Sequence, residues 1–297
     1  MLEEKRYLDA LDVKGILSEI IPQMLFVDER IMLYKELGFC NYNIDKLEEW
    51  VNIKGLFNKE HFYEYLSLKG LTVDDIALAF KNLTKEERTK VLIKARQLEC
   101  VKIVEEIVSN YLEEYKRIDF DSDNIDLDIS LLPFTYYFSK KLNCILEKIS
   151  NFQLEKKAIE NVVKQLSQYL IQLTIKAVIN ELHVDKEKGL LEGATGEERF
   201  KSFVKNRFIN PEKLIDFYRT YPVLLRRLAK KTKDFTEFIE KMLTDLDRNF
   251  EKICMKIGIK PETNLITRIE CGKGDVHEKG KFTAIIELKD GTKLVYK

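Results

Sequence analysis

Apolar residues recur every three or four positions along most of the chain, and three stretches show this period clearly. Such spacing puts the apolar side chains on one face of a helix that packs on a core. It predicts a helix from about residue 84 to 117, a second over 159–177 and a third over 235–257. The three predicted faces are Val91, Ala95, Leu98, Val101, Val104, Val108, Tyr111 and Tyr115; Ile159, Val163, Leu166, Leu170, Leu173 and Ala177; and Phe235, Ile239, Met242, Leu246, Phe250, Ile253 and Ile257.

Local motifs mark where several of these helices begin and end. Thr84 is followed three residues later by Glu87, and Thr195 by Glu198, which is the spacing of a capping box. In this motif the hydroxyl accepts from an early amide and the glutamate reaches back to the first one. Gly258 comes directly after the third stripe and is placed as a C-terminal stop.

After Pro261 the apolar period changes from helical to alternating, which is typical of strands. Residues 265–271 alternate loosely, residues 282–288 alternate clearly, and Asp290-Gly291 favours a tight hairpin into residues 293–297. In that last strand Lys293, Val295 and Lys297 share one face, because alternate residues point to the same side. The sequence therefore predicts a mainly α-helical protein that ends in a small antiparallel β unit.

The same changes of pattern divide the chain into three regions. We expect an N-terminal helical region over residues 1–130, a second helical region over 131–260 and the β unit over 261–297. A length of 297 residues allows more than one structural unit.

Charge and hydropathy exclude several function classes. The 50 basic and 50 acidic side chains leave no net charge, which argues against a nucleic-acid partner. No apolar run reaches membrane-span length, and the first residues are too charged for a secretory signal. We therefore expect a cytoplasmic protein without a membrane span.

Candidate metal ligands fail on their spacing. The five cysteines form no CxxC pair, so we expect free, mostly buried thiols and no zinc. The acidic run from Asp119 to Asp128 begins like a calcium loop, but Asn124 replaces the turn glycine and Ser130 the closing glutamate. No metal site is predicted from the residues alone.

The glycine-rich segment 272–281 invites comparison with phosphate-binding loops. Gly274 and Gly280 enclose five residues instead of the four of a Walker A loop, and Phe282 stands after Lys281 where that loop has Ser or Thr. The protein-kinase glycine loop would need glycine at His277. On spacing alone the segment is a polar hairpin loop, either a site or simply solvated.

Within this segment Asp275 and His277 are two positions apart, so on an extended backbone they can project to the same side. A carboxylate that orients an imidazole suits proton transfer. The alternative is a surface aspartate and a solvated histidine.

In these residues the chain resembles the dehydratase domain of class II lanthipeptide synthetases, the LanM type. The resemblance rests on Gly274-Asp275-Val276-His277, on Gly280 with the strand that follows, and on Asp290-Gly291-Thr292-Lys293-Leu294-Val295-Tyr296-Lys297. Two upstream segments, residues 196–203 and 221–224, are also similar, and the likeness extends from about Leu132 to Lys297.

The resemblance implies an enzyme that uses ATP and Mg²⁺ to phosphorylate Ser and Thr of a ribosomal precursor peptide and then eliminates the phosphate to give dehydroamino acids. It implies that the β unit is the start of a lipid-kinase-like N-lobe. By the same resemblance Lys297 contacts the nucleotide phosphates, and Asp275 and His277 are tied to phosphate elimination.

Members of that family continue beyond this lysine into a C-lobe with catalytic and metal-binding residues, and then into a zinc-dependent cyclase domain. We therefore expect an N-terminal portion of such an enzyme, inactive as this chain alone. Two alternatives stay open. One is a non-enzymatic helical module that binds a peptide or partner protein, and the other is half of a split dehydratase completed in trans by a C-terminal polypeptide.

Overall fold

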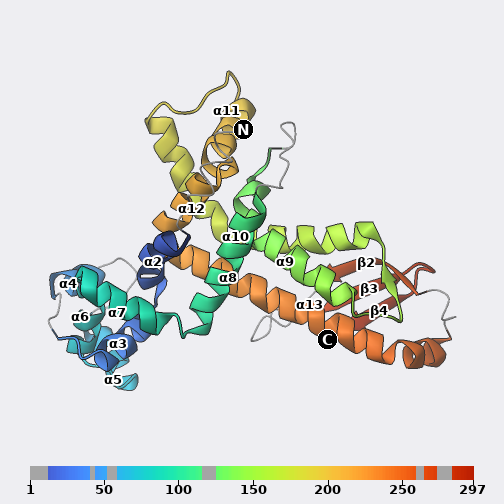
Figure 1. The fold of residues 1–297 in the computed structure, drawn as a ribbon, viewed down its shortest axis with the longest axis horizontal. Coiled ribbons are helices and arrows are strands. Elements are labelled where there is room, and N and C mark those ends of the chain that lie inside the picture. Colours follow the sequence, from blue (N-terminus) through green and yellow to red (C-terminus); the bar gives the residue numbers. More distant parts are fainter. Residues whose placement is uncertain (1–12, 41–43, 52–58, 116–124, 259–263, 273–282) are drawn as a thin grey trace. The chain divides into compact units, whose positions relative to one another are not determined.

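The computed structural model describes residues 13–40, 44–51, 59–115, 125–258, 264–272 and 283–297 (Figure 1). The chain forms two compact units, one over Leu11–Lys102 and the other over Ile103–Lys297. The boundary between them falls inside helix α8 (Glu99–Glu114). The division at 130 and 260 that the sequence suggests remains a prediction about domains.

The first unit is built entirely of helices among its described residues. They are α2 (Val13–Met24), α3 (Val27–Glu36), α4 (Ile44–Val51), α5 (Lys59–Leu68), α6 (Val73–Ala79) and α7 (Lys85–Ala95). Helices α3 to α6 share a core that includes Ile31, Leu47, Phe62 and Ile76. Helix α2 contacts α7.

Both predicted capping boxes are confirmed. The Glu87 amide donates to the Thr84 hydroxyl at 3.2 Å, and the Thr84 amide donates to the Glu87 carboxylate at 2.9 Å. The same reciprocal bonds join Thr195 and Glu198 at the start of α11 (Gly196–Val204). These side chains satisfy amides that have no partner inside the helix.

The prediction of one helix from about residue 84 to 117 is wrong. Helix α7 ends at Ala95, and a new helix, α8 (Glu99–Glu114), begins after a tight turn. In that turn the amides of Gln97 and Leu98 donate to the carbonyls of Lys94 and Ala95. The apolar stripe continues across the turn, because most of its side chains are buried on both helices. Periodicity therefore located the buried face but not the break.

The second unit contains two long helices and several short ones. Beyond α8 they are η2 (Leu127–Leu131), α9 (Leu132–Leu146), α10 (Lys156–Glu187), α11, η3 (Lys205–Ile209, a π-helix), α12 (Pro211–Thr220) and α13 (Pro222–Ile257). Helix α9 packs against α13 (Figure 1), and the rings of Phe138 and Phe235 meet there edge to face with their centroids 5.3 Å apart. Gly258 ends α13 with a φ of 74°, as predicted.

The predicted apolar face of α10 is offset from the buried one. Leu166 and Leu170 are buried as expected, but the other buried positions up to Val178 each lie one residue away from a predicted one, and Asp185 lies beyond the predicted stripe. The buried set is Ala158, Val162, Leu166, Ser167, Leu170, Thr174, Val178 and Asp185. The buried face thus includes polar side chains, whose hydrogen bonds to nearby groups offset their loss of water.

The strands form one small mixed sheet in the order β1-β2-β3-β4. They are β1 (Gln153–Leu154), β2 (Leu265–Cys271), β3 (Ala284–Leu288) and β4 (Lys293–Tyr296). The antiparallel β2–β3–β4 part is as predicted, and β1 adds a short parallel strand from the middle of the chain. The mainly α-helical fold class is confirmed.

Two further expectations can be compared with the structure. All five cysteines are free thiols, but the expectation that most are buried is wrong, since Cys254 is buried while Cys40 and Cys144 are exposed. In the part of the chain that the structure describes, none of the helices has both the length and the apolar character needed to span a membrane.

Candidate functional site

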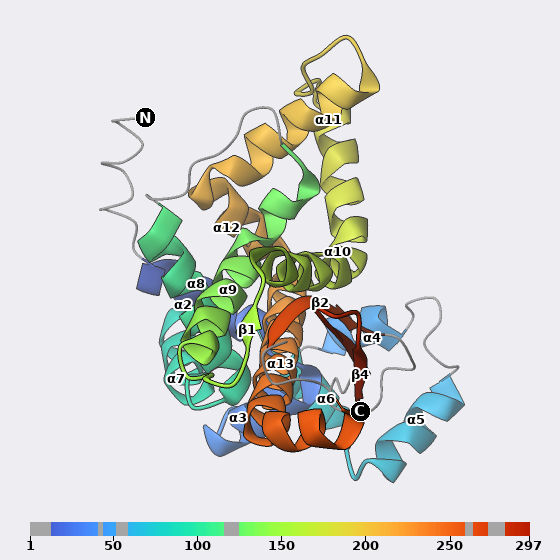
Figure 2. The same ribbon diagram turned by 90° about the vertical axis from the view of Figure 1, so that its right-hand side faces the viewer.

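The C-terminal sheet is held by two helices, and both views show its strands between α10 and the C-terminal half of α13 (Figures 1 and 2). Gln165 on α10 joins the two: its amide nitrogen donates to the Ile269 carbonyl at 2.7 Å, and its amide oxygen accepts from the Cys271 amide at 2.7 Å. One side chain thereby satisfies two backbone groups at the edge of β2. The sheet is anchored by a polar contact that its apolar pattern did not reveal.

Strand β4 is fixed on α13 through Tyr296. Its hydroxyl donates to the Asp245 carboxylate at 2.9 Å, and its ring lies 5.9 Å from that of Phe238. Burial and the Asp245 carboxylate raise the pKa of Tyr296 to about 12. Alternation then puts Lys293 and Val295 on the opposite face of the strand, as the sequence predicted.

Lys297, the predicted nucleotide-contacting residue, directly follows β4 and is exposed. Among the described residues its ammonium has neither a hydrogen bond nor an ion pair. Lys293, four positions earlier on the same strand face, is 3.9 Å from the Glu287 carboxylate. Asp275 and His277 lie outside the described residues, so their closeness to Lys297 remains a prediction.

A groove of about 530 Å³ runs between α13 and β4. Its apolar lining includes Leu246, Ile253, Leu294 and Val295, and Lys252 and Lys256 also line it. Val295 is 60% exposed, which is unusual for an apolar strand residue. Lys297 is not among the lining residues, so this groove and the proposed phosphate contact are separate features.

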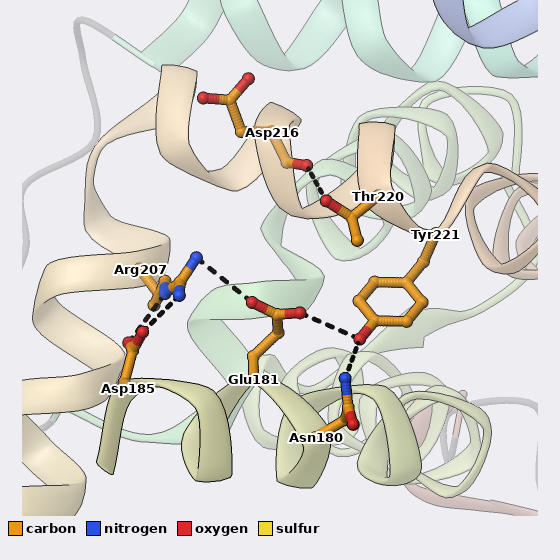
Figure 3. Close-up of polar contacts among 7 residues, drawn as sticks. All are labelled: Asn180, Glu181, Asp185, Arg207, Asp216, Thr220 and Tyr221. Atoms are coloured by element: carbon orange, nitrogen blue, oxygen red, sulfur yellow. Dashed lines mark hydrogen bonds and ion pairs between the residues drawn. The ribbon is translucent and has the colours of Figure 1, made fainter. Parts of the chain in front are cut away.

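A second polar cluster lies around Arg207, in the π-helix η3 (Figure 3). The Arg207 Nε donates to the Asp185 carboxylate at 2.8 Å, and a second guanidinium nitrogen contacts the other carboxylate oxygen. The third nitrogen is 3.3 Å from Glu181. One guanidinium therefore holds two carboxylates that lie one turn apart on α10.

Tyr221 extends this cluster to the start of α13. Its hydroxyl donates to the Glu181 carboxylate at 2.9 Å and accepts from Asn180 at 2.8 Å (Figure 3). The hydrogen bond to Asp185, with the charges of Asp185 and Glu181, raises the pKa of Arg207. Because the Asp185 side chain is only 4% exposed, the pairing offsets a large cost of burying its charge. The hydrogen bonds and ion pairs of this cluster, which we call the clamp, hold together α10, η3 and the α12–α13 junction.

Sequence reasoning missed this clamp. The spacing of Glu181 and Asp185, four residues apart, was a usable signal, because it puts two carboxylates on one helix face. Nothing in the sequence indicated that Arg207 would face them, since it stands in a π-turn whose position the period of 3.6 residues does not predict.

The residues present can be tested against the implied ATP and Mg²⁺. Lys297 fits a phosphate contact, because it is cationic, exposed and not engaged by a described acid. No group of three His, Cys, Asp or Glu side chains within the described ranges is arranged to hold a metal ion. The ligands of Mg²⁺ are therefore not assigned to any residue described here.

Residues 221–297 match the family model described as "Domain of unknown function (DUF4135)", a domain that is found in lanthipeptide synthetase-like proteins. The matched segment begins at Tyr221 of the Arg207 cluster and covers α13 and the strands β2, β3 and β4. No curated protein matches the chain. The match thus relates the C-terminal quarter of the chain to a domain of lanthipeptide synthetase-like proteins, and it does not extend to residues 1–220.

Proposed function

We propose that this chain contributes the nucleotide-facing part of a lanthipeptide dehydratase of the LanM type. The observation that carries the proposal is the family match over residues 221–297, which ends on β4 and Lys297. The resemblance of residues 274–297 to LanM-type enzymes lies within the same matched segment and agrees with it. ATP and Mg²⁺ are the proposed cofactors, and a ribosomal precursor peptide is the proposed substrate.

The proposed chemistry has two steps. A Ser or Thr hydroxyl of the peptide forms a bond to the γ-phosphorus of ATP, the bond from that phosphorus to ADP breaks, and the hydroxyl proton is released. A base then removes the α-proton, the bond between Cβ and oxygen breaks, and phosphate leaves with its electron pair. The product is a dehydroamino acid, and ATP supplies the leaving group.

Lys297 is proposed to hold the nucleotide phosphates during the first step. Phosphoryl transfer depends on positioning and on charge stabilisation, so an exposed ammonium at the end of a fixed strand suits this role. The bond between Tyr296 and Asp245 fixes the residue next to it. Asp275 and His277 are proposed to act in the elimination, with the roles of base and orienting group left open.

The test is co-expression with a candidate precursor peptide, with and without the polypeptide encoded directly downstream. Mass spectrometry of the peptide reports phosphorylation as a gain of phosphate and dehydration as a loss of water. We expect both products with the downstream polypeptide, and their loss in Lys297→Ala. Lys293→Ala is the matched control, because Lys293 lies on the same strand face and should not touch the nucleotide.

A lysine-reactive acyl-phosphate derivative of ATP tests the nucleotide contact directly. We expect it to label Lys297, and we expect Mg-ATP to suppress that labelling but not labelling of Lys293. The proposal is wrong if ATP leaves the labelling of Lys297 unchanged and no phosphorylated or dehydrated peptide forms in either co-expression.

A second candidate function is strand-mediated binding of a partner protein, and one observation favours it. In the described sheet β4 is the last strand, it pairs only with β3, and its Val295 is 60% exposed. An edge of this kind can accept a strand from another chain. Val295→Lys would weaken such an assembly in size-exclusion chromatography while leaving ATP protection of Lys297 intact.

A further inference from the structure

A second groove, of about 640 Å³, lies within the first unit. It is lined by residues of α2, α3 and α7 and by the segment 79–83. Its volume is within the range of about 300–1,000 Å³ that is usual for ligand sites. The family match does not reach this unit, and the groove is independent of the proposed dehydratase chemistry.

The groove concentrates positive charge. Arg30, Lys81, Lys85 and Arg88 line it, and among the described lining residues Glu19 is the only acid. Lys81 is neutralised by Glu87, whose carboxylate is 3.3 Å from its ammonium. The other three cations therefore decide what the groove can bind.

These three cations do not have a full set of hydrogen-bond or ion-pair partners among the described residues. Within the described ranges, neither the Lys85 ammonium nor the Arg88 guanidinium has a hydrogen bond or an ion pair. Arg30 donates from one nitrogen to the Gln23 carbonyl at 3.0 Å, but its buried Nε has no partner in the same ranges. A buried donor without a partner costs free energy that a ligand can recover.

The placement of Lys85 and Arg88 is also unfavourable for the helix that carries them. Both stand in the first turn of α7, where the helix dipole favours negative charge. The two acids of that turn have other partners: Glu86 pairs with Lys90 at 3.1 Å, and Glu87 accepts from the Thr84 amide and pairs with Lys81. An anionic ligand in the groove would therefore supply Lys85 and Arg88 with the acid partner that these two glutamates do not give them.

Arg30, Arg88 and Tyr34 all line the groove. Burial raises the pKa of the Tyr34 hydroxyl, the negative charge of Glu87 also raises it, and the positive charges of Arg30 and Arg88 oppose that rise. The two side chains come from different helices, α3 and α7, and act on one hydroxyl. A carboxylate beside Tyr34 would therefore be within reach of more than one cation.

The lining favours a peptide over a free phosphate. Phosphate sites commonly use glycine-rich loops or free amides at a helix N-terminus. The described lining contains no glycine, and the capping box of Thr84 and Glu87 already occupies amides at the start of α7. Apolar Pro22, Leu83 and Leu92 lie among the cations, which suits a segment with both carboxylates and apolar side chains.

We propose that this groove of the first unit binds an acidic peptide segment, with Arg30, Lys85 and Arg88 holding its carboxylates and the apolar lining taking its apolar side chains. The attraction is partly solvent-exposed, so added salt should weaken binding. Because Lys297 and ATP have no part in it, binding here can fail or succeed separately from the proposed dehydratase function.

The test uses the full chain and a rhodamine-labelled peptide of alternating Glu and Leu pairs, followed by fluorescence anisotropy. We expect Lys85→Glu combined with Arg88→Glu to raise the Kd by at least about tenfold. Lys102→Glu, a charge reversal at an exposed lysine of the same unit outside the groove, should change the Kd by less than about twofold. Circular dichroism checks that each variant is folded.

Two further measurements distinguish an acidic peptide from a neutral peptide and from a free phosphate. The same peptide with every Glu replaced by Gln should bind at least about tenfold more weakly. Inorganic phosphate should compete less well than unlabelled acidic peptide at equal concentration. Equal binding of the Gln peptide, better competition by phosphate, or an unchanged Kd in the double variant would each overturn the proposal.

Discussion

The cluster around Arg207 pairs its arginine with two acids, whereas the groove beside Arg88 pairs Lys81 with Glu87 but leaves other cations without an acid. Arg207 contacts two carboxylates, one of which belongs to a side chain only 4% exposed. Arg88 and Lys85 have no acid partner among the described residues, although both are lining residues of a groove. Since each group belongs to a different unit, the difference concerns their chemistry and not their relative position.

This difference separates charges that are paired inside the protein, which we call structural, from charges that are left for a ligand, which we call available. A buried charge lowers the stability of the folded state unless it is paired. The ion pairs of Arg207 are therefore needed to keep the protein folded. Exposed cations in a groove keep their hydration, and their charge can still attract a ligand. Removing the first kind should therefore reduce stability, and removing the second kind should reduce binding alone.

The largest expected effect comes from breaking the buried cluster. Arg207→Met leaves Asp185 and Glu181 facing each other without a cation, so we expect a loss of about 3–5 kcal/mol in the free energy of unfolding. Urea unfolding followed by circular dichroism measures it. Arg227→Met, at an exposed position on α13, is the matched control and should change stability by less than about 0.5 kcal/mol. A loss below about 1 kcal/mol for Arg207→Met would remove the distinction between the two groups.

Two buried tyrosines allow the same comparison, between a group with a partner and a group without one, for neutral hydroxyls. The Tyr218 hydroxyl donates to the Ser130 carbonyl at 2.6 Å, whereas the buried Tyr111 hydroxyl has no partner among the described residues. Tyr218→Phe leaves a buried carbonyl without this donor and should cost about 1–2 kcal/mol. Tyr111→Phe should be neutral or stabilising by up to about 1 kcal/mol, because it removes a hydroxyl that lost its water on burial.

The same unfolding assay compares the two tyrosine variants directly. Each replaces the same hydroxyl by hydrogen inside a fully buried ring, so differences in packing are small. Equal losses in the two variants would mean that Tyr111 has a partner in the folded protein, and the classification by pairing would then fail.

Much of the fold could be predicted from the sequence, because apolar period and capping residues act locally. The Thr84 and Thr195 caps, the stop at Gly258 and the change from helix to strand near residue 261 needed no long-range information. The exact buried face of α10 did need it, since the buried Ser167 donates to Asp128, which lies 39 positions away in the sequence. Strand β1 is two residues long and has no period to recognise.

In the candidate site, too, some features could be predicted from local sequence patterns and others could not. Motif and alternation placed Lys297 on the face of β4 with Lys293 and Val295, opposite Tyr296. The contacts of Gln165 with β2 and of Arg207 with α10 join residues that are distant in sequence or lie in an irregular turn, so no local pattern announces them. The groove of the first unit depends on four segments meeting, which the spacing of cations alone does not reveal.

A smaller effect is expected where a paired group is only partly buried. Tyr296→Phe removes the 2.9 Å bond to Asp245 but keeps the ring on Phe238, so we expect a loss of about 0.5–1.5 kcal/mol. Hydrogen exchange of the β4 amides should rise more than that of β2. Asp245→Asn tests the same bond from the other side, and a protection pattern unchanged in both variants would contradict the role given to this contact.

The smallest effect concerns a paired acid in the same unit as the unpaired cations. Asp75 accepts from the Thr72 amide at 3.0 Å and lies 2.6 Å from the Lys35 ammonium. Burial raises the pKa of Asp75, but the bonds to Lys35 and Thr72 outweigh it, so the net pKa is lowered. A lowered folded pKa gives stability that is present above the unfolded pKa of about 3.9 and is lost as pH falls below it.

We therefore expect Asp75→Asn to cost about 1 kcal/mol near pH 7 and to flatten the loss of stability below about pH 4. Unfolding midpoints measured in urea from neutral to acidic pH would show this as two curves that converge at low pH. Asp74→Asn, at the exposed neighbouring position, is the control and should leave the wild-type curve unchanged. If the curves of unfolding midpoint against pH were parallel for wild type and Asp75→Asn, the pairing of Asp75 would contribute nothing to stability. Asp75 would then resemble Lys85 and Arg88, whose charges do not hold the fold together.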